Sequence, residues 1–263
     1  MIVGIIQARM GSTRLPGKIM RDVCGKPMLE MMIERVRRSK TLEKIVIATS
    51  TNKEDDIIVE FCNKMNVDFY RGSENDLIAR YKGASDMFGV DVVVRLTSDT
   101  PIMDSYVIDK VVDVYVKNDY DFVSNCYPMP RTYPDGMNVE VFSAKILDEA
   151  FKESKKPSER EHVTFFMWMN TERYKIFRVD YDRDVSMYRF NLDYPEDYTV
   201  LKSIFEGLYP KNPMFTMEDA IKWLDENPDV FKINSHIKPG SGFYRSLDSD
   251  KKAGFEVNQK GLF

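Results

Sequence analysis

Three cations, two hydroxyl groups and two glycines lie in one short loop near the start of the chain. The loop, QARMGSTRLPGK at residues 7–18, follows directly on the apolar run of residues 2–6. Its glycines permit close backbone approach to a ligand, and the N–H groups of such a loop can bind phosphate oxygens. Its two arginines offer planar guanidinium groups, and Lys18 offers a compact charge. The loop therefore predicts a polyphosphate site whose cations would stabilise a departing pyrophosphate; the alternative is a solvated basic loop.

The common nucleotide-binding motifs do not match this loop. The Walker pattern G-x-x-x-x-G-K-[ST] fails because the two glycines are one residue too far apart and Ile19 stands where Ser or Thr is needed. The pattern G-x-G-x-x-G is also absent from the loop. An ordinary P-loop ATPase or a Rossmann dehydrogenase is therefore disfavoured.

Two aspartates follow later strand-like runs. Asp99 comes just after the apolar run of residues 92–96, and Asp193 lies between a predicted strand and a predicted helix. Ligands of open parallel sheets bind beyond the carboxyl ends of the strands. A carboxylate beside a triphosphate is tolerable with a bridging cation, most often Mg²⁺. The two aspartates could thus hold one metal ion or two; for Asp99 the alternative is a turn or helix cap before Pro101.

The elements that must position these residues alternate between strands and helices in the first half of the chain. Strands are predicted at residues 2–6, 45–48, 67–70 and 92–96. Helices are predicted from Pro27, from a capping box at 51–54, and over 74–88 and 104–117. This rhythm of continuous apolar strands and helices predicts a mostly parallel sheet covered on both faces.

The second half is less regular. Strands are predicted at 122–124 and 138–142 around a Pro-rich loop, and at 175–181 and 187–192 as a hairpin. Helices are predicted from a capping box at 158–161 through about 169, and over 195–208 and 217–224. Residues 233–263 receive no assignment. The simplest arrangement is one α/β domain with an inserted β-rich lobe for the acceptor.

Composition excludes several classes of protein. The 263 residues carry a net charge of −4, so no global basic field would attract nucleic acid. Three widely spaced cysteines and two histidines form neither a disulfide framework nor a His-rich zinc site. No run of 18 apolar residues predicts a membrane span, and a strand beginning at residue 2 leaves no room for a signal peptide. We therefore expect a cytoplasmic protein with reduced thiols.

Several segments together resemble the cytidylyltransferase family, which includes CMP-KDO synthetases, acylneuraminate cytidylyltransferases and the spore-coat polysaccharide protein SpsF. The opening QARMGSTRLPGK and GKPML at 25–29 carry the resemblance most clearly. The SpsF-like branch is the nearest. The further matching segments are YRGSE at 70–74, VRLT at 94–97, TYPDG at 132–136, VEVF at 139–142, EREHV at 159–163, and Asp193 with PED at 195–197.

The resemblance covers roughly residues 1–208 and implies a Rossmann-like nucleotide-diphospho-sugar transferase fold. It implies CTP as the donor, Mg²⁺ as the cofactor and a homodimer. The implied organisation is a single nucleotidyltransferase domain over 1–232, with a CTP-binding half at 1–118, an acceptor and dimerisation lobe at 119–192 and returning helices at 193–232. Residues 233–263 would form a tail of unknown role.

The resemblance also implies roles for individual residues. The nucleotide-binding residues would be Gln7, Ala8, Arg9, Gly11, Ser12, Thr13, Arg14, Lys18, Arg71, Ser73, Asp76, Arg80 and Asp99. Asp99 and Asp193 would hold the metal, and Arg9 and Lys18 would join them in catalysis. The chain departs from the family where Asn138 replaces a usual Asp and Tyr194 replaces a common Thr.

The acceptor end is less clearly defined by the sequence. Arg131, Arg160 and Arg189 could each bind an anionic group, and we assign Glu140 to the same region. His162 could act as a base, although a structural role in an apolar helix is the alternative. We expect in-line transfer of CMP to a sugar acid of the nonulosonic or sialic-acid type, in surface polysaccharide or glycan biosynthesis. Alternatives are transfer to a sugar phosphate, an A-type glycosyltransferase, and a non-catalytic nucleotide-sensing protein.

Overall fold

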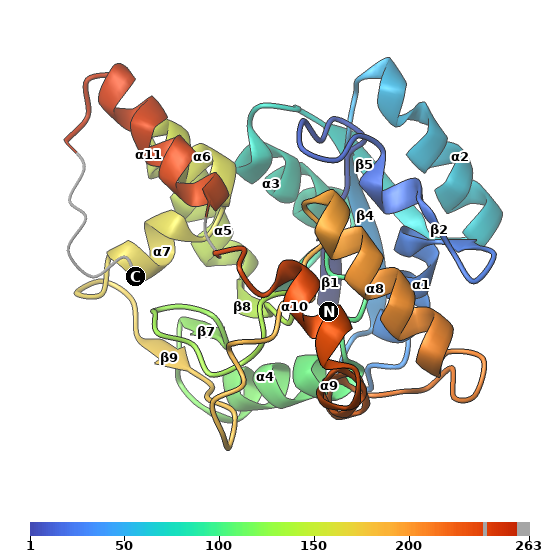
Figure 1. Ribbon diagram of the computed structural model, residues 1–263. Coiled ribbons are helices and arrows are strands. Elements are labelled where there is room, and N and C mark those ends of the chain that lie inside the picture. The colour runs from blue at the N-terminus through green and yellow to red at the C-terminus, as the bar shows by residue number, and fades with distance from the viewer. Residues whose placement is uncertain (239–240, 257–263) are drawn as a thin grey trace.

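A computed structural model describes residues 1–238 and 241–256 of the chain, and its centre is a seven-stranded sheet (Figure 1). The strand order is β5-β4-β1-β6-β8-β7-β9. The strands are β1 (Ile2–Gln7), β4 (Lys44–Ser50), β5 (Asp68–Gly72), β6 (Val92–Thr97), β7 (Phe122–Ser124), β8 (Glu140–Ser143) and β9 (Ile176–Arg178). Strands β5, β4, β1 and β6 are parallel, β8 is antiparallel to both neighbours, and β7 and β9 are parallel. The predicted Rossmann-like α/β fold is confirmed.

Helices cover both faces of the sheet. The helices are α1 (Met28–Val36), α2 (Asp56–Met65), α3 (Leu77–Met87), α4 (Ser105–Lys117), α5 (Ala144–Glu153), α6 (Pro157–His162), α7 (Phe165–Met169), α8 (Pro195–Leu208), α9 (Met217–Glu226), α10 (Pro228–Asn234) and α11 (Ser241–Lys252). Two short 3₁₀ helices, η1 (Lys18–Met20) and η2 (Lys53–Asp55), and a hairpin of β2 (Asp22–Val23) and β3 (Lys26–Pro27) complete the elements. No helix in the described ranges is long and apolar enough to cross a membrane.

Alternate side chains of the strands enter two separate cores. Ile6 of β1 packs with helices α1, α2, α4, α8 and α9, whereas Ile5 packs with α3, α5 and α7. On β6, Leu96 belongs to the first core and Val93 to the second. Burial of both faces explains why these strands are continuous apolar runs rather than alternating ones.

Two predicted capping boxes are wrong. Helix α2 begins at Asp56 after η2, and no Thr51 side chain caps it; the Asp55 carboxylate instead accepts hydrogen bonds from the N–H groups of Ser50 and Met10. Helix α6 is capped by Glu159, which accepts from the N–H of Lys156 at 3.1 Å. The predicted helix through residue 169 is therefore shifted at its start.

That helix is also broken in the middle, and the predicted hairpin does not exist. Val163, with φ of 51°, separates α6 from α7. Strand β9 pairs with β7, and residues 187–192 contribute a single bridge between Asp135 and Arg189. The side chains of Tyr188, Phe190 and Leu192 are buried, and they anchor an extended loop in the core rather than the predicted strand.

The tail also contains structure that the sequence analysis did not assign. Helix α10 ends at Asn234, and α11 packs beside α6 (Figure 1). Part of the unassigned range, residues 239–240 and 257–263, lies outside the described residues.

Candidate active site

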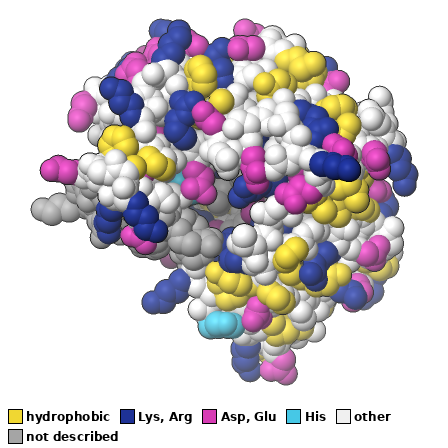
Figure 2. Space-filling view, turned by 90° about the horizontal axis from the view of Figure 1, so that it is seen from above, with side chains coloured by type: hydrophobic (Ala, Val, Ile, Leu, Met, Phe, Trp, Pro, Cys, Tyr) yellow, Lys and Arg dark blue, Asp and Glu magenta, His cyan; other side chains and the backbone are white. Residues whose placement is uncertain are grey.

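A cavity of about 700 Å³ lies beyond the carboxyl ends of β1 and β6, and we call it the main cavity. Its lining comes from the 7–18 loop, the loop before α3, the end of β6, helix α6 and Asp193. Seen from above, this face is hollowed near its centre, with Lys, Arg, Asp and Glu side chains around the hollow (Figure 2). The parallel half of the sheet thus places the site where ligands of open α/β sheets bind.

Backbone contacts hold the 7–18 loop against neighbouring strands. The N–H of Ala8 donates to the carbonyl of Ala48 at 3.1 Å, and the N–H of Met10 donates to Asp55 at 2.7 Å. Gly17 then adopts φ of 65°, and η1 begins at the next residue, Lys18. This left-handed turn suits glycine, and it leads the chain into the 3₁₀ helix that presents Lys18 to the cavity.

Lys18, Asp99 and Asp193 meet at one point of the main cavity. The Lys18 Nζ lies 2.9 Å from Asp99 Oδ2 and 2.9 Å from Asp193 Oδ1. Arg14 Nη2 lies 2.6 Å from the same Asp193 oxygen. The predicted convergence of the first loop with both aspartates is therefore what the structure shows.

The opposite charges in this cluster stabilise each other in their ionised forms. Burial disfavours the Lys18 ammonium, but Asp99 and Asp193 outweigh that effect and raise the pKa of Lys18. Burial also disfavours the Asp193 carboxylate, but Lys18 and Arg14 lower the pKa of Asp193 to about 2. Lys18 and Asp193 are therefore both charged at neutral pH.

Arg14 has hydrogen-bond donors that are not used within the described part of the protein. Its Nε and Nη1 atoms are buried and have no hydrogen-bond partner in the described structure. Its guanidinium also lies 5.1 Å from the centre of the Tyr194 ring, so the Tyr that replaces a common Thr supports this arginine. Buried donors without a partner are costly unless an anionic ligand uses them.

Asp99 and Asp193 are held by the backbone around them. The N–H of Leu192 donates to the carbonyl of Asp99 at 2.8 Å and so joins the two segments. The N–H groups of Asp193 and Tyr194 both donate to Asp197 Oδ2 at 3.0 Å. Asp197 is fully buried in the first turn of α8, so it fixes the position of Asp193.

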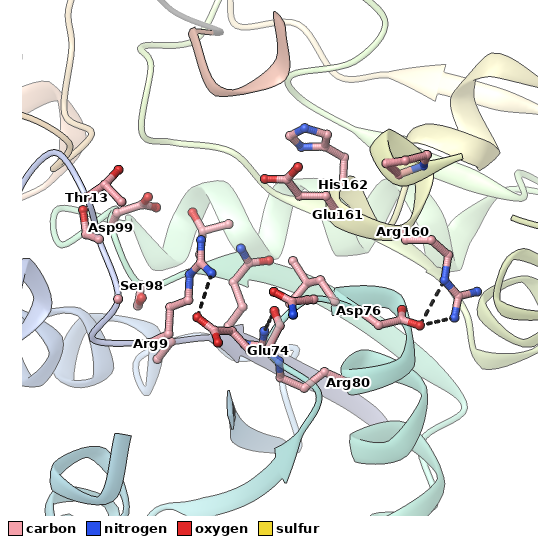
Figure 3. Close-up of a pocket in the computed structure, with 18 of the residues that line it drawn as sticks. Arg9, Thr13, Glu74, Asp76, Arg80, Ser98, Asp99, Arg160, Glu161 and His162 are labelled. Carbon is pink, nitrogen blue, oxygen red and sulfur yellow. Dashed lines mark hydrogen bonds and ion pairs between the residues drawn. The ribbon is translucent and has the colours of Figure 1, made fainter. Parts of the chain in front are cut away.

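Most of the residues predicted to bind nucleotide line the main cavity. They are Gln7, Ala8, Arg9, Gly11, Ser12, Thr13, Arg14, Lys18, Asp76, Arg80 and Asp99. Arg9 lies 3.6 Å from Glu74, and Arg80 donates to the carbonyls of Ser73 and Glu74, as Figure 3 shows for the labelled residues.

Arg71 and Ser73 are not part of the cavity lining. Arg71 donates to the carbonyls of Ser50 and Asn52 and forms an ion pair with Asp56 at 2.7 Å. Ser73 accepts a hydrogen bond from the N–H of Asp76. Both residues stabilise the loops around the site, and their predicted contact with nucleotide finds no support in the geometry.

A second, smaller cavity of about 160 Å³ adjoins the main one and shares Arg95, Thr97, Asp99 and His162 with it. We call it the small cavity. Its remaining lining is Tyr127, Asn138, Glu140, Thr164, Trp168 and Asn191. The rings of Tyr127 and Trp168 stack with their centres 4.8 Å apart. Aromatic faces beside neutral hydrogen-bonding groups suit a sugar ring.

Two of the predicted acceptor residues, Glu140 and Arg160, line the cavities and form ion pairs with neighbouring side chains. Glu140 forms an ion pair with Arg95 and also accepts from the Thr164 hydroxyl, so its charge is neutralised. Arg160 forms an ion pair with Asp76, which also caps α3 (Figure 3). Sequence reasoning assigned no role to Arg95, although a cation inside the run VVVRL was the signal that could have identified it.

The two other predicted acceptor arginines, Arg131 and Arg189, lie outside both cavities. Arg131 pairs with Asp135 at 2.9 Å. Arg189 pairs with Asp197 at 2.8 Å and also with Asp135 and Asp193. Burial would lower the pKa of Arg189, but these carboxylates, Asp197 foremost, raise it. The structure corrects the prediction: Arg189 belongs to a buried ion-pair network beneath Asp193, not to an acceptor surface.

The fold and this site define a nucleotidyltransferase. The family model for cytidylyltransferases matches residues 3–229, and the chain belongs to that family. It is a CTP-dependent nucleotidyltransferase.

Similar proteins cover most of the chain. The spore coat polysaccharide biosynthesis protein SpsF of Bacillus subtilis is 30% identical, over 87% of this chain and 96% of its own. A cytidylyltransferase structure from Leptospira borgpetersenii is 38% identical with a TM-score of 0.83, over 88% of this chain and 96% of its own. A structure of CMP:2-keto-3-deoxy-manno-octonic acid synthetase complexed with CTP is 16% identical with a TM-score of 0.59. It covers 78% of this chain and 98% of its own, and it supports the fold alone.

Proposed function

We propose that this cytidylyltransferase moves CMP from CTP to an anionic sugar-type acceptor, of which a sugar acid is the leading candidate, in surface polysaccharide or glycan biosynthesis. The observation that carries the proposal is the cluster of Lys18, Arg14, Asp99 and Asp193 in the main cavity, of which Asp99 also lines the small cavity. The acceptor oxygen would attack the α-phosphorus of CTP, and the bond to the β-phosphate oxygen would break to release pyrophosphate.

Lys18 and Arg14 are placed to stabilise that leaving group. Transfers of this kind depend mainly on positioning and charge stabilisation. The unpartnered buried N–H groups of Arg14 can donate to phosphate oxygens without breaking an existing hydrogen bond. The Lys18 ammonium sits between two carboxylates, and it can exchange them for phosphate when the nucleotide enters.

Asp99 and Asp193 would hold Mg²⁺, and their geometry fits that ion. Both carboxylates lie within 2.9 Å of one point, and Mg²⁺ prefers oxygen ligands and shares them with substrate phosphates. Within the described ranges no group of three or more His, Cys, Asp or Glu residues could hold a metal, so the nucleotide would complete the coordination. When bound, the ion would polarise the α-phosphate.

The sugar would occupy the small cavity. Tyr127 and Trp168 offer an aromatic wall, and Asn138 and Asn191 offer amide groups to hydroxyls. Arg95 is paired with Glu140, and Arg160 is paired with Asp76, so we assign the anion of the acceptor to Lys155, which lines the main cavity just before α6.

Product analysis tests the proposal. The protein would be incubated with CTP, Mg²⁺ and a panel of sialic-acid-type sugars, octulosonic acids and sugar phosphates. We expect free pyrophosphate and a CMP-linked sugar acid, and loss of both with Asp99→Asn or Asp193→Asn. Asp86→Asn, at an exposed carboxylate of α3, is the matched control. Release of a nucleoside diphosphate would favour a glycosyltransferase, and binding of CTP without turnover of any acceptor would favour a nucleotide sensor.

A further inference from the structure

Helix α11 lies beyond the residues that the family model matches and yet takes part in the site. The match ends at residue 229, whereas α11 spans Ser241–Lys252 and packs beside α6 (Figure 1). Ser246, Leu247 and Asp250 of α11 are each at most 2% exposed. The contact is therefore a packed interface, and two of these three buried side chains, Ser246 and Asp250, are polar.

Asp250 anchors α11 to the start of α6. Its carboxylate accepts from the N–H of Ser158 at 2.8 Å and from the Ser158 hydroxyl. A buried carboxylate with two donors is well satisfied, and one of these donors is an N–H group at the N-terminus of α6, which has no partner within the helix. These two hydrogen bonds fix the position of α11 along α6.

Ser246 makes the contacts that reach the cavity. Its hydroxyl donates to Glu161 Oε2 at 2.6 Å, and its oxygen lies 2.8 Å from His162 Nε2. A serine hydroxyl has one proton, and a carboxylate only accepts. Because Glu161 takes that proton, the second contact requires His162 Nε2–H to donate to Ser246. The network therefore specifies the tautomer of His162 with its proton on Nε2.

The surroundings of His162 favour its neutral form. Burial lowers the pKa of His162 to about 4 and outweighs Glu161 and Asp250, which raise it; Arg95 of β6 lowers it further. At neutral pH the ring is therefore uncharged and carries one proton, which the hydrogen bond to Ser246 places on Nε2.

Glu161 and His162 both line the main cavity, and Figure 3 shows them adjacent on the wall that faces Asp99. We propose that Ser246 is a positioning residue that holds Glu161 and His162 in one arrangement toward a hydroxyl-bearing sugar acceptor, so that α11 completes the acceptor end of the site. This inference rests on the proposed function for the identity of the substrate class. Glu161 can accept hydrogen bonds from sugar hydroxyls, whereas the triphosphate would lie at Arg14 and Lys18 of the 7–18 loop, so the nucleotide end should not depend on α11.

Nuclear magnetic resonance on the protein alone tests the network. The chain has two histidines, so ¹⁵N-histidine labelling gives two ring systems, with exposed His236 as the internal reference. We expect His162 in the Nε2–H tautomer, and loss of that single tautomer in Ser246→Ala but not in Ser246→Thr, which keeps the hydroxyl. An unchanged His162 spectrum in Ser246→Ala would overturn the proposal.

Kinetics then separate positioning from folding. With the acceptor that the wild type turns over fastest, Ser246→Ala should raise KM for the acceptor about tenfold and leave the stabilisation by CTP unchanged. Asp248→Asn, at an exposed carboxylate of the same helix, is the control. Equal losses toward CTP and acceptor would overturn the proposal. If no acceptor is turned over, the proposed function fails, and the spectrum of His162 still decides whether Ser246 positions it.

Discussion

Replacement of Lys18 by Met should tighten metal binding and slow catalysis at the same time. Its ammonium lies 2.9 Å from both Asp99 and Asp193, where we propose that Mg²⁺ binds. A metal ion that enters without nucleotide must displace this ammonium. We propose that the same ammonium stabilises the departing pyrophosphate. Its loss should therefore raise the affinity for the metal ion and lower kcat.

The size of each effect follows from the contacts of Lys18. Hydrogen bonds to charged groups contribute about 1.5–3 kcal/mol each, but Asp99 and Asp193 are 28% and 17% exposed. We therefore discount each bond to about 1 kcal/mol for screening by solvent. The variant should bind a divalent ion about 30-fold more tightly, since about 1.4 kcal/mol is tenfold. Its kcat should fall by roughly 100-fold or more, as for other electrostatic stabilisers.

Electron paramagnetic resonance of free Mn²⁺ would measure metal binding without nucleotide, and pyrophosphate release would measure turnover. The double variant Lys18→Met, Asp99→Asn should lose the gain in Mn²⁺ affinity because one carboxylate is gone. Lys26→Met removes another lysine that pairs with two carboxylates, Glu30 and Glu34, outside the cavities, and should leave turnover unchanged. Unchanged Mn²⁺ affinity, or a kcat within threefold of wild type, would refute the reasoning.

Three further predictions concern stability. Arg189→Met should lower the free energy of unfolding in urea by about 3–5 kcal/mol, because buried Asp197 would lose its cation; a loss below 1 kcal/mol would argue against the buried network. The folded-state pKa of His162, about 4, lies below its ordinary 6.5, so the unfolded chain binds this proton first as the pH falls. The wild type should therefore lose up to about 3 kcal/mol between pH 6.5 and 4 that His162→Gln does not lose, and parallel pH profiles would contradict this. Gly136→Ala should destabilise the protein by about 3 kcal/mol or prevent folding, because φ is 101° and a Cβ would lie 2.5 Å from the carbonyl carbon of Phe190; a thermal midpoint equal to wild type would show that the loop adapts.

The first half of the fold could be predicted because its signals are local and repeated. Continuous apolar strands followed by amphipathic helices imply a parallel sheet, and a parallel sheet brings the ends of its strands to one edge. That rule alone placed the 7–18 loop and Asp99 together, as the ion pair between Lys18 and Asp99 shows. Functional residues at the ends of parallel strands can thus be predicted to lie together before any contact is known.

The second half could not be predicted because long-range contacts decide it. Residues 187–192 alternate like a strand, yet Arg189 is drawn into ion pairs with Asp135 and Asp197 and the segment stays a loop. The sequence does not reveal whether a charged side chain faces a cavity or pairs with a buried residue of opposite charge. The assignment of Arg131 and Arg189 to the acceptor failed for that reason.

The role of α11 shows the same limit. Its sequence is polar, and nothing local indicates that Ser246 and Asp250 are buried against α6. Only the tertiary structure reveals that Glu161 and His162 share one serine. A capping pattern at 158–161 suggested a helix start there, whereas Ser158 bonds to Asp250 instead.

Thermal unfolding with Mg²⁺ and each of CTP, UTP, GTP and ATP tests the central claim most directly. A ligand at 100 times its Kd stabilises the folded state by about 2.7 kcal/mol, which gives a measurable shift in Tm. We expect CTP to stabilise the protein more than the other three, and Asp99→Ala to remove most of that shift. Equal shifts with all four nucleotides, or stabilisation by a nucleotide sugar but not by CTP, would contradict the assignment of the main cavity to CTP.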